Sequence, residues 1–214
     1  MNTSNYIYLH GFASSPISHK AKYLAQEFSR LSIPLSIPDL NQGDFSHLTL
    51  TRQLQQVKDI FPPLPTSVTL IGSSFGGLTA AILGEQFPQI QRLVLLAPAF
   101  GFLNHWRAKL GEAEMEKWQD SGYLPVYHYG EGKILSLDYD FFRDVSQHKE
   151  EHLQRRVPTL IIHGVDDEVI PIKASREYTR SRSWVQLLEL PSDHTLSNVL
   201  PEIWQQIQDF CQIN

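Results

Sequence analysis

The fold of this chain is decided by the stretch VTLIGSSFGG at residues 68–77. A run of apolar and β-branched residues leads directly into the pattern Gly-x-Ser-x-Gly, which is centred on Ser74. A serine on a sharp strand-to-helix turn needs small residues two positions before and two positions after it, because the strand and the helix pass close together there. Gly72 and Gly76 meet that requirement, so the stretch predicts a strand, a nucleophile elbow and a helix.

The residues after the elbow favour a helix that packs closely against a sheet. Small residues recur every four positions, at Gly76, Ala80 and Gly84, and residues at this spacing share one helix face. Ser73 is the neighbouring hydroxyl, but it is out of register with the glycines. The alternative is a Gly/Ser-rich turn without a chemical role, because the bare pattern is short.

Short β-type runs alternate with amphipathic stretches along most of the chain. Most of these runs are apolar on both faces, which is typical of buried strands in a parallel sheet. The runs are residues 6–9, 35–37, 68–71, 93–96, 159–162 and 184–188, and helical periodicity occupies residues 19–31, 49–61 and 196–210. We therefore expect an α/β fold with a mostly parallel sheet of about six strands flanked by helices.

The interval between Pro98 and Pro158 is too long for a single crossover helix. We predict a single domain, residues 1–214, with a core of residues 1–100 and 157–214 and a helical lid at residues 101–156, inserted before the strand that carries an acidic loop. The lid is expected to hold a helix at residues 103–119 and a polar helix at residues 139–154. Its middle is rich in turn residues, namely Gly122, Pro125, Gly130 and Gly132.

A serine hydroxyl is a poor nucleophile unless a base takes its proton and a third group orients that base. Candidates lie downstream of Ser74. The stretch HGVDDEVIP at residues 163–171 follows a predicted strand, and His194 follows the last one. The order serine, aspartate, histidine is the order of the α/β-hydrolase fold. We therefore predict Ser74 as nucleophile, His194 as base and Asp167 as the acid, with Asp193 as a bystander.

These motifs resemble those of the α/β-hydrolase superfamily, and in particular the small YqiA-like bacterial esterases and the single-domain acyl-protein thioesterases. The resemblance extends over nearly the whole chain through HGFASSP at residues 10–16, the Ser74 elbow, residues 163–171 and residues 192–194. In that family the acid usually lies four residues after the histidine of a His-Gly pair. That pair is His163-Gly164 here, which implies Asp167 as the acid. Asp166 remains the alternative.

A serine hydrolase must also stabilise the oxyanion of its tetrahedral intermediate with preorganised N–H donors. Phe75 follows the nucleophile and would present its backbone N–H from the start of the helix. The resemblance implies that Phe12, just after His10 and Gly11, supplies the second N–H. We interpret His10 as structural, hydrogen-bonded to backbone, and His163 as a turn residue.

The predicted lid carries many large apolar side chains for an insertion. Trp106, Trp118, Phe141 and Phe142 are candidates to line an apolar pocket above Ser74, since ligand sites are mostly apolar with a few placed polar groups. The substrate expected from this pattern is a small, hydrophobic ester or thioester. Neither an organic cofactor nor a metal is required by this chemistry.

Other classes of function remain as alternatives. A lidded hydrolase with the same triad could act on peptide or carbon–carbon bonds, and a non-catalytic binding module could retain the fold. The segment from His148 to His152 fits His-x-x-Glu-His, a zinc-binding spacing on a helix. That segment is polar nearly all round, as a solvated helix would be, so we expect no zinc there.

Composition limits the partners of this chain. Its 18 basic and 23 acidic residues give no basic surface for nucleic acid, and no run approaches the roughly 18 apolar residues of a membrane helix. One cysteine, Cys211, fits a reducing compartment, and Met1–Asn5 lacks the basic region of a signal peptide. We expect a cytoplasmic protein with a small-molecule substrate; the pattern predicts no oligomeric state.

Overall fold

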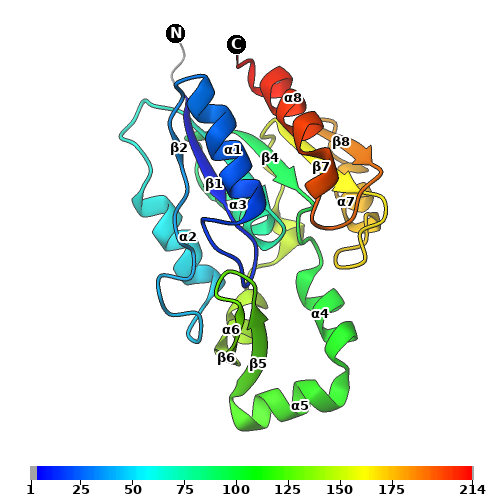
Figure 1. The fold of residues 1–214 in the computed structure, drawn as a ribbon. Coiled ribbons are helices and arrows are strands. Elements are labelled where there is room, and N and C mark those ends of the chain that lie inside the picture. The colour runs from blue at the N-terminus through cyan, green and yellow to red at the C-terminus, as the bar shows by residue number, and fades with distance from the viewer. Residues whose placement is uncertain (1–3, 214) are drawn as a thin grey trace.

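The computed structural model describes residues 4–213. Its centre is a six-stranded sheet in the order β2-β1-β3-β4-β7-β8, and every neighbouring pair of strands is parallel (Figure 1). The strands are β1 (Asn5–Leu9), β2 (Leu35–Ser36), β3 (Val68–Ser73), β4 (Ile90–Leu96), β7 (Thr159–Gly164) and β8 (Val185–Leu190). The predicted α/β fold with about six mostly parallel strands is confirmed.

The central strands are apolar on both faces because helices cover both faces of the sheet. Every residue of β3 and of β7 is buried. Alternate residues of β1 enter different apolar layers: Ile7 and Leu9 face one layer, whereas Tyr6 and Tyr8 face the other. The sheet therefore separates two hydrophobic cores.

Helices α1 (His19–Arg30) and α8 (Leu200–Cys211) cover the face that Tyr6 and Tyr8 share. Helices α2 (Leu50–Asp59), α3 (Phe75–Gln86) and α7 (Lys173–Thr179) cover the opposite face. The 3₁₀ turn η2 (Ser197–Val199) leads into α8. Helix α3 is buried at every residue from Phe75 to Gly84, which is why its sequence is apolar all round rather than amphipathic.

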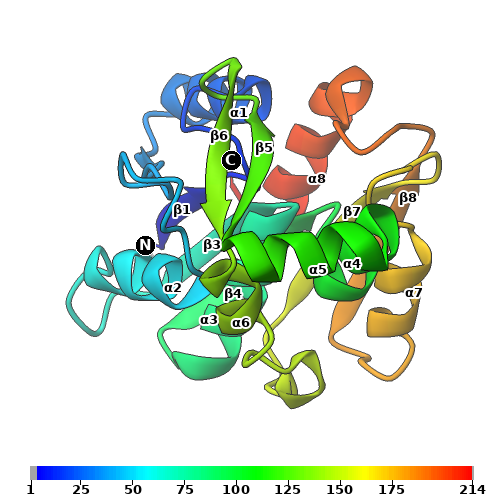
Figure 2. The ribbon, with the colours of Figure 1, turned by 90° about the horizontal axis from the view of Figure 1, so that it is seen from below.

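The insertion between β4 and β7 contains helices, as the sequence predicts, but it also contains a β-hairpin that the sequence does not predict. It holds α4 (Phe102–Leu110), α5 (Glu112–Ser121), the antiparallel hairpin of β5 (Tyr123–His128) and β6 (Lys133–Asp138), α6 (Asp140–Val145) and the 3₁₀ turn η1 (Glu150–His152). The insertion lies beyond the end of the sheet where the parallel strands terminate (Figures 1 and 2).

Three local features explain these differences. The helix predicted at residues 103–119 is interrupted at Gly111, whose φ of +79° is incompatible with a helix. The turn-rich middle is a hairpin, in which Leu124 and Leu137 are opposite each other and both are buried. The polar helix predicted at residues 139–154 ends at Val145, because the segment after it has no apolar stripe to bury.

Hydrogen bonds hold the insertion against the core, two of them donated by the insertion backbone and one accepted by an insertion side chain. The Tyr129 N–H donates to the Ala13 carbonyl at 2.7 Å, and the Asp138 N–H donates to the Ser46 carbonyl at 2.9 Å. The Asp144 carboxylate accepts from the Thr51 N–H at 2.9 Å. The hairpin therefore has a fixed position next to the loop that follows β1.

Residues 4–213 include no helix that is both long enough and apolar enough to cross a lipid bilayer.

We expect Gly76→Ala to lower the free energy of unfolding by about 3 kcal/mol or more. A Cβ atom at Gly76 would lie 2.2 Å from the Leu9 carbonyl oxygen, and backbone cannot move aside cheaply. Gly84→Ala is the matched control on the same helix, because its Cβ would meet only the flexible end of Leu93. Gly84→Ala should change the free energy of unfolding by no more than about 1 kcal/mol. Circular dichroism during urea unfolding measures both variants. Equal losses of stability in the two variants would contradict the predicted clash at Gly76.

Candidate active site

Ser74 occupies the turn between β3 and α3 in a strained conformation, with φ of +54° and ψ of −117°. The turn is possible because glycines flank it. A Cβ atom at Gly72 would lie 2.3 Å from the Gly76 carbonyl oxygen, and a Cβ atom at Gly76 would lie 2.2 Å from the Leu9 carbonyl oxygen. The sequence pattern at residues 72–76 thus corresponds to a tight strand-to-helix elbow.

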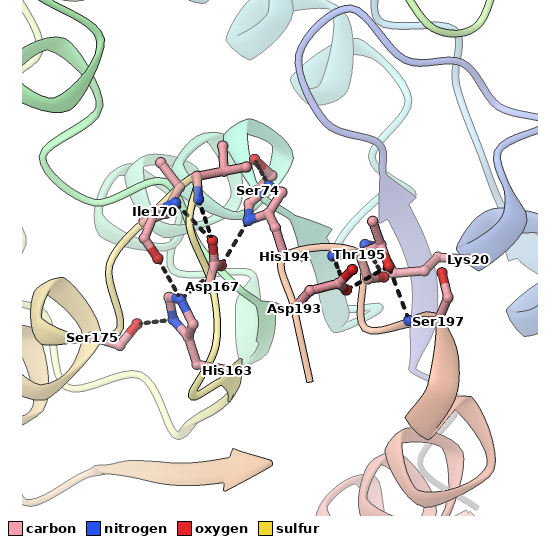
Figure 3. Close-up of polar contacts among 11 residues, drawn as sticks. Lys20, Ser74, His163, Asp167, Ile170, Ser175, Asp193, His194, Thr195 and Ser197 are labelled. Atoms are coloured by element: carbon pink, nitrogen blue, oxygen red, sulfur yellow. Dashed lines mark hydrogen bonds and ion pairs between the residues drawn. The ribbon is translucent and has the colours of Figure 1, made fainter. Parts of the chain in front are cut away.

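His194, in the loop after β8, lies between the serine and a carboxylate (Figure 3). Its Nε2 is 3.0 Å from Ser74 Oγ, and its Nδ1 is 2.7 Å from Asp167 Oδ2. An ionised carboxylate only accepts hydrogen bonds, so Nδ1 carries the proton and Nε2 is left to accept the Ser74 hydroxyl proton. The fold brings together three residues that are separated by up to 120 positions in the sequence.

The structure distinguishes Asp167 from its neighbour Asp166. The Asp167 side chain is fully buried, and its Oδ1 accepts the backbone N–H groups of Val169 and Ile170, each at 2.8 Å. Asp166 is exposed and no contact joins its carboxylate to His194. Burial alone would raise the pKa of Asp167, but the hydrogen bonds from His163, His194 and Ile170 outweigh burial and hold the pKa well below its ordinary value. Asp167 is therefore ionised at neutral pH.

His163 is not the turn residue that the sequence predicts; it lies inside β7 and contacts the acid. Its Nε2 is 3.0 Å from Asp167 Oδ2 and 2.9 Å from the Ile170 carbonyl oxygen. Both are acceptors, so Nε2 carries a proton, and Nδ1 is 2.7 Å from Ser175 Oγ. The signal that could have revealed this role is a histidine at the end of a buried strand, directly before an acidic loop.

The acid loop and the histidine loop approach each other at Gly164. A Cβ atom at this position would lie 2.2 Å from the Ser192 carbonyl oxygen and 2.6 Å from the Asp193 carbonyl oxygen. Glycine therefore lets the loop that carries His194 come close to the end of β7. Asp193 itself points away from the triad and accepts from the Thr195 N–H and hydroxyl at 2.9 and 2.6 Å (Figure 3).

The loop after β1 lies directly against the serine. A Cβ atom at Gly11 would lie 3.3 Å from Ser74 Cβ, so the backbone at Phe12 is close to the nucleophile. Phe75 is the first residue of α3, where helix N–H groups have no intrahelical acceptor. The Phe12 and Phe75 rings pack edge to face, with centroids 6.2 Å apart. Both predicted oxyanion donors thus belong to segments that adjoin Ser74.

His10 is hydrogen-bonded to backbone on both sides, as the sequence analysis expects. Its Nε2 accepts the Leu40 N–H at 3.0 Å, so the proton is on Nδ1, which donates to the Gly11 carbonyl at 3.0 Å. Burial lowers the pKa of His10, which keeps the ring neutral. The side chain fixes the loop that carries Gly11 and Phe12.

A cavity of about 610 Å³ opens above the serine, between the core and the insertion. The core contributes Ser74, His194 and Phe12 to its walls, and α4 contributes Trp106. The hairpin supplies further lining residues, Val126, Tyr127 and Tyr129, which are not among the four substrate contacts predicted above. No sequence signal identified them, because their position depends on how the hairpin folds back.

The predicted substrate contacts of Trp118, Phe141 and Phe142 are not found. Trp118 is 1% exposed and donates its Nε1–H to the Leu137 carbonyl at 2.9 Å. Phe141 is fully buried, and Phe142 stacks on Tyr139. These three rings pack the insertion onto itself and onto the core, whereas Trp106 alone of the four candidates lines the cavity.

The segment from His148 to His152 does not have the geometry that a helical zinc motif needs. Helix α6 ends at Val145, and His152 lies in the separate 3₁₀ turn. His148 Nε2 contacts Thr51 Oγ1 at 3.0 Å, and the Glu150 carboxylate accepts the Gly101 N–H at 2.9 Å. Within residues 4–213, no group of three or more His, Cys, Asp or Glu side chains is arranged to hold a metal ion.

The family described as "Uncharacterised protein family (UPF0227)" matches residues 5–212 of this chain. The chain belongs to UPF0227. The family match, together with the folds of the solved structures described next, confirms the resemblance to YqiA-like esterases and to the α/β-hydrolase fold.

Similar proteins show that this UPF0227 member has the α/β-hydrolase fold. The mouse protein "Serine hydrolase BPHL" is 27% identical over 141 residues, which are 60% of this chain and 48% of that protein, so the match spans about half of the relative's length. Est1E from Butyrivibrio proteoclasticus, solved with ferulic acid, superposes with a TM-score of 0.83 at 19% identity over 98% of this chain and 88% of that chain. Mouse "Alpha/beta hydrolase domain-containing protein 10" gives a TM-score of 0.82 at 19% identity, covering 98% of this chain and 90% of its own.

We expect Asp167→Asn to slow the labelling of Ser74 by a fluorophosphonate about 10³-fold, because an amide that donates to Nδ1 would force the wrong tautomer on His194. Asp166→Asn, the matched control one residue away, should change the labelling rate less than about threefold. Mass spectrometry of the labelled peptide measures both rates. A larger loss in Asp166→Asn than in Asp167→Asn would assign the acid to Asp166.

Proposed function

We propose that this UPF0227 protein cleaves carboxylic ester or thioester bonds of a small acyl substrate through an acyl-serine intermediate on Ser74. The observation that carries the proposal is the contact of His194 with both partners, at 3.0 Å to Ser74 Oγ and 2.7 Å to Asp167 Oδ2. A nucleophile, a base and an orienting acid in hydrogen-bond contact are the machinery of acyl transfer.

In the first half of the reaction, Ser74 Oγ attacks the carbonyl carbon while its proton moves to His194 Nε2. The oxyanion of the tetrahedral intermediate accepts hydrogen bonds from the backbone N–H groups of Phe12 and Phe75, whose contribution in such sites is several kcal/mol. The intermediate then collapses, the bond to the alcohol or thiol breaks, and His194 returns the proton to the leaving group. Asp167 stabilises the imidazolium throughout.

In the second half, water replaces the leaving group. His194 takes a proton from the water molecule while the water oxygen attacks the carbonyl carbon of the acyl-serine. A second tetrahedral intermediate then forms, and its oxyanion occupies the same site. Its collapse breaks the bond to Ser74 Oγ, releases the carboxylic acid and restores the serine hydroxyl with the proton from His194. The cycle therefore leaves the protein unchanged.

The cavity favours a substrate with an apolar portion of limited size. Its volume of about 610 Å³ is within the range of small-molecule sites, and the rings of Phe12, Phe102 and Trp106 form one wall. An acyl or aryl group packed against these rings would bring the scissile carbonyl to Ser74. The fold itself does not specify the substrate, and the same triad serves peptide and carbon–carbon hydrolases elsewhere.

We expect Ser74→Ala to reduce kcat/KM for p-nitrophenyl esters by at least about 10⁴-fold, because the nucleophile is removed. Ser73→Ala is the matched control, since Ser73 is the adjacent hydroxyl at the end of β3, and it should keep most of the activity. The assay uses p-nitrophenyl esters and acyl thioesters of graded chain length, with and without a chelator.

Retained activity in Ser74→Ala would refute the assigned nucleophile, and loss of activity on chelation would indicate a metal enzyme. Absence of both hydrolysis and fluorophosphonate labelling in the wild type would favour a binding module on the hydrolase fold. Labelling without hydrolysis of any ester or thioester would direct the search to peptide or carbon–carbon bonds.

A further inference from the structure

Lys20, in the first turn of α1, lines the same cavity as Ser74 and His194. Its Nζ donates to the carbonyl oxygen of Thr195, the residue after His194, at 2.7 Å (Figure 3). A lysine ammonium has three N–H donors, and this carbonyl accepts one of them. Within residues 4–213, Lys20 forms no ion pair with a carboxylate. A cation with spare donors therefore lies beside the reactive centre.

The charge of the cavity wall is opposite to that of the chain. The ionisable lining residues other than tyrosines are His19, Lys20, His105, Lys109 and His194, and no described lining residue is Asp or Glu. The whole chain, in contrast, has 23 acidic and 18 basic residues and a net charge of −5. Two lysines in one cavity wall, with no acidic side chain among the described lining residues, attract an anionic ligand.

The two carboxylates that act on the charge of Lys20, those of Asp167 and Asp193, accept hydrogen bonds from other partners. The Asp167 side chain is fully buried behind His194 and accepts hydrogen bonds from two histidines and two backbone N–H groups. The Asp193 carboxylate accepts from the Thr195 N–H and hydroxyl. Burial lowers the pKa of Lys20 to about 8, although Asp167 and Asp193 oppose the shift. At neutral pH the ammonium is mainly protonated, so a partly buried cation faces the cavity and favours a bound counter-ion.

We propose that the substrate carries a carboxylate, in addition to the bond that is cleaved, and that Lys20 is the residue that selects it. The apolar wall of Phe12 and Trp106 would hold the uncharged part of the substrate, while the charged end would lie at the start of α1. This inference rests on the proposed ester or thioester hydrolysis and specifies its substrate class.

The experiment compares two matched pairs of esters. In the first pair the charge is on the acyl side: mono-p-nitrophenyl adipate against its methyl ester. In the second pair the charge is on the leaving group: 4-carboxyphenyl butyrate against 4-(methoxycarbonyl)phenyl butyrate. The measured quantity is kcat/KM for the charged ester divided by kcat/KM for its neutral partner. Comparing this ratio between wild type and variant removes the contribution of the esters' different intrinsic reactivities.

We expect Lys20→Met to lower this ratio about 10- to 100-fold for one of the two pairs, as the loss of a charge-assisted hydrogen bond would. Lys20→Arg should keep most of the ratio because it retains the charge. Lys20→Gln should lower the ratio because the charge is lost, although glutamine can still donate a hydrogen bond. This variant replaces Lys20→Met in the test if Lys20→Met does not fold. Lys22→Met removes the same charge from an exposed position on α1 and should leave the ratio within about threefold.

An unchanged ratio in Lys20→Met and Lys20→Gln for both pairs would overturn the proposal. Equal losses for the charged and neutral members would also overturn it, because Lys20 would then only anchor the Thr195 carbonyl and the His194 loop. Failure of the proposed function gives a different result: none of the four esters would be hydrolysed in a manner that depends on Ser74, and the inference would fail with it.

Discussion

Ser74 adopts a left-handed φ of +54° that costs a non-glycine residue on the order of 1–3 kcal/mol, and the surrounding backbone maintains it. Its N–H donates to the Leu96 carbonyl at 2.9 Å, and its own carbonyl accepts the N–H groups of Gly77 at 2.8 Å and Ala99 at 3.0 Å. These bonds form only when β3 and β4 are paired in the correct register and α3 begins directly after Ser74. The rest of the site depends on this elbow, because it fixes the position of Ser74, the proposed nucleophile, relative to the sheet.

Asp167, the proposed acid of the triad, shows how hydrogen bonds stabilise a buried charge. An isolated carboxylate inside a protein is strongly unfavourable, so the buried Asp167 would take up a proton without partners. Instead, its two oxygens accept four hydrogen bonds, two from backbone N–H groups and two from His163 and His194. These bonds keep the carboxylate ionised and fix the tautomer of both imidazoles. As a result, the unprotonated Nε2 of His194 faces the Ser74 hydroxyl and can accept its proton.

The core carries the reactive groups and part of the cavity wall, and the insertion supplies the rest of the wall. The core strands and their loops carry the serine, the acid and the histidine, whereas α4 and the β5–β6 hairpin carry Trp106 and Tyr127. The hairpin is joined to the loop after β1 by the bond from the Tyr129 N–H to the Ala13 carbonyl. A change in the insertion would therefore alter the shape of the cavity without touching the triad, which is how one fold accommodates many substrates.

The sequence by itself contains Ser74, Asp167 and His194 in the chain order of the α/β-hydrolase fold. It also determined the sheet of about six mostly parallel strands and the elbow at Ser74, because these depend on local spacing: apolar runs, and glycines two positions from a serine. It did not determine the hairpin, since strand pairing within the insertion depends on cross-strand contacts such as Leu124 with Leu137. Only the tertiary structure decided between Asp166 and Asp167 and placed His163 against the acid. It also buried Trp118 and Phe141 away from the cavity and brought Lys20 beside His194. In each case the residues in contact belong to separate segments of the chain. The distance between them depends on how the helices, strands and loops pack, and no single stretch of sequence encodes it.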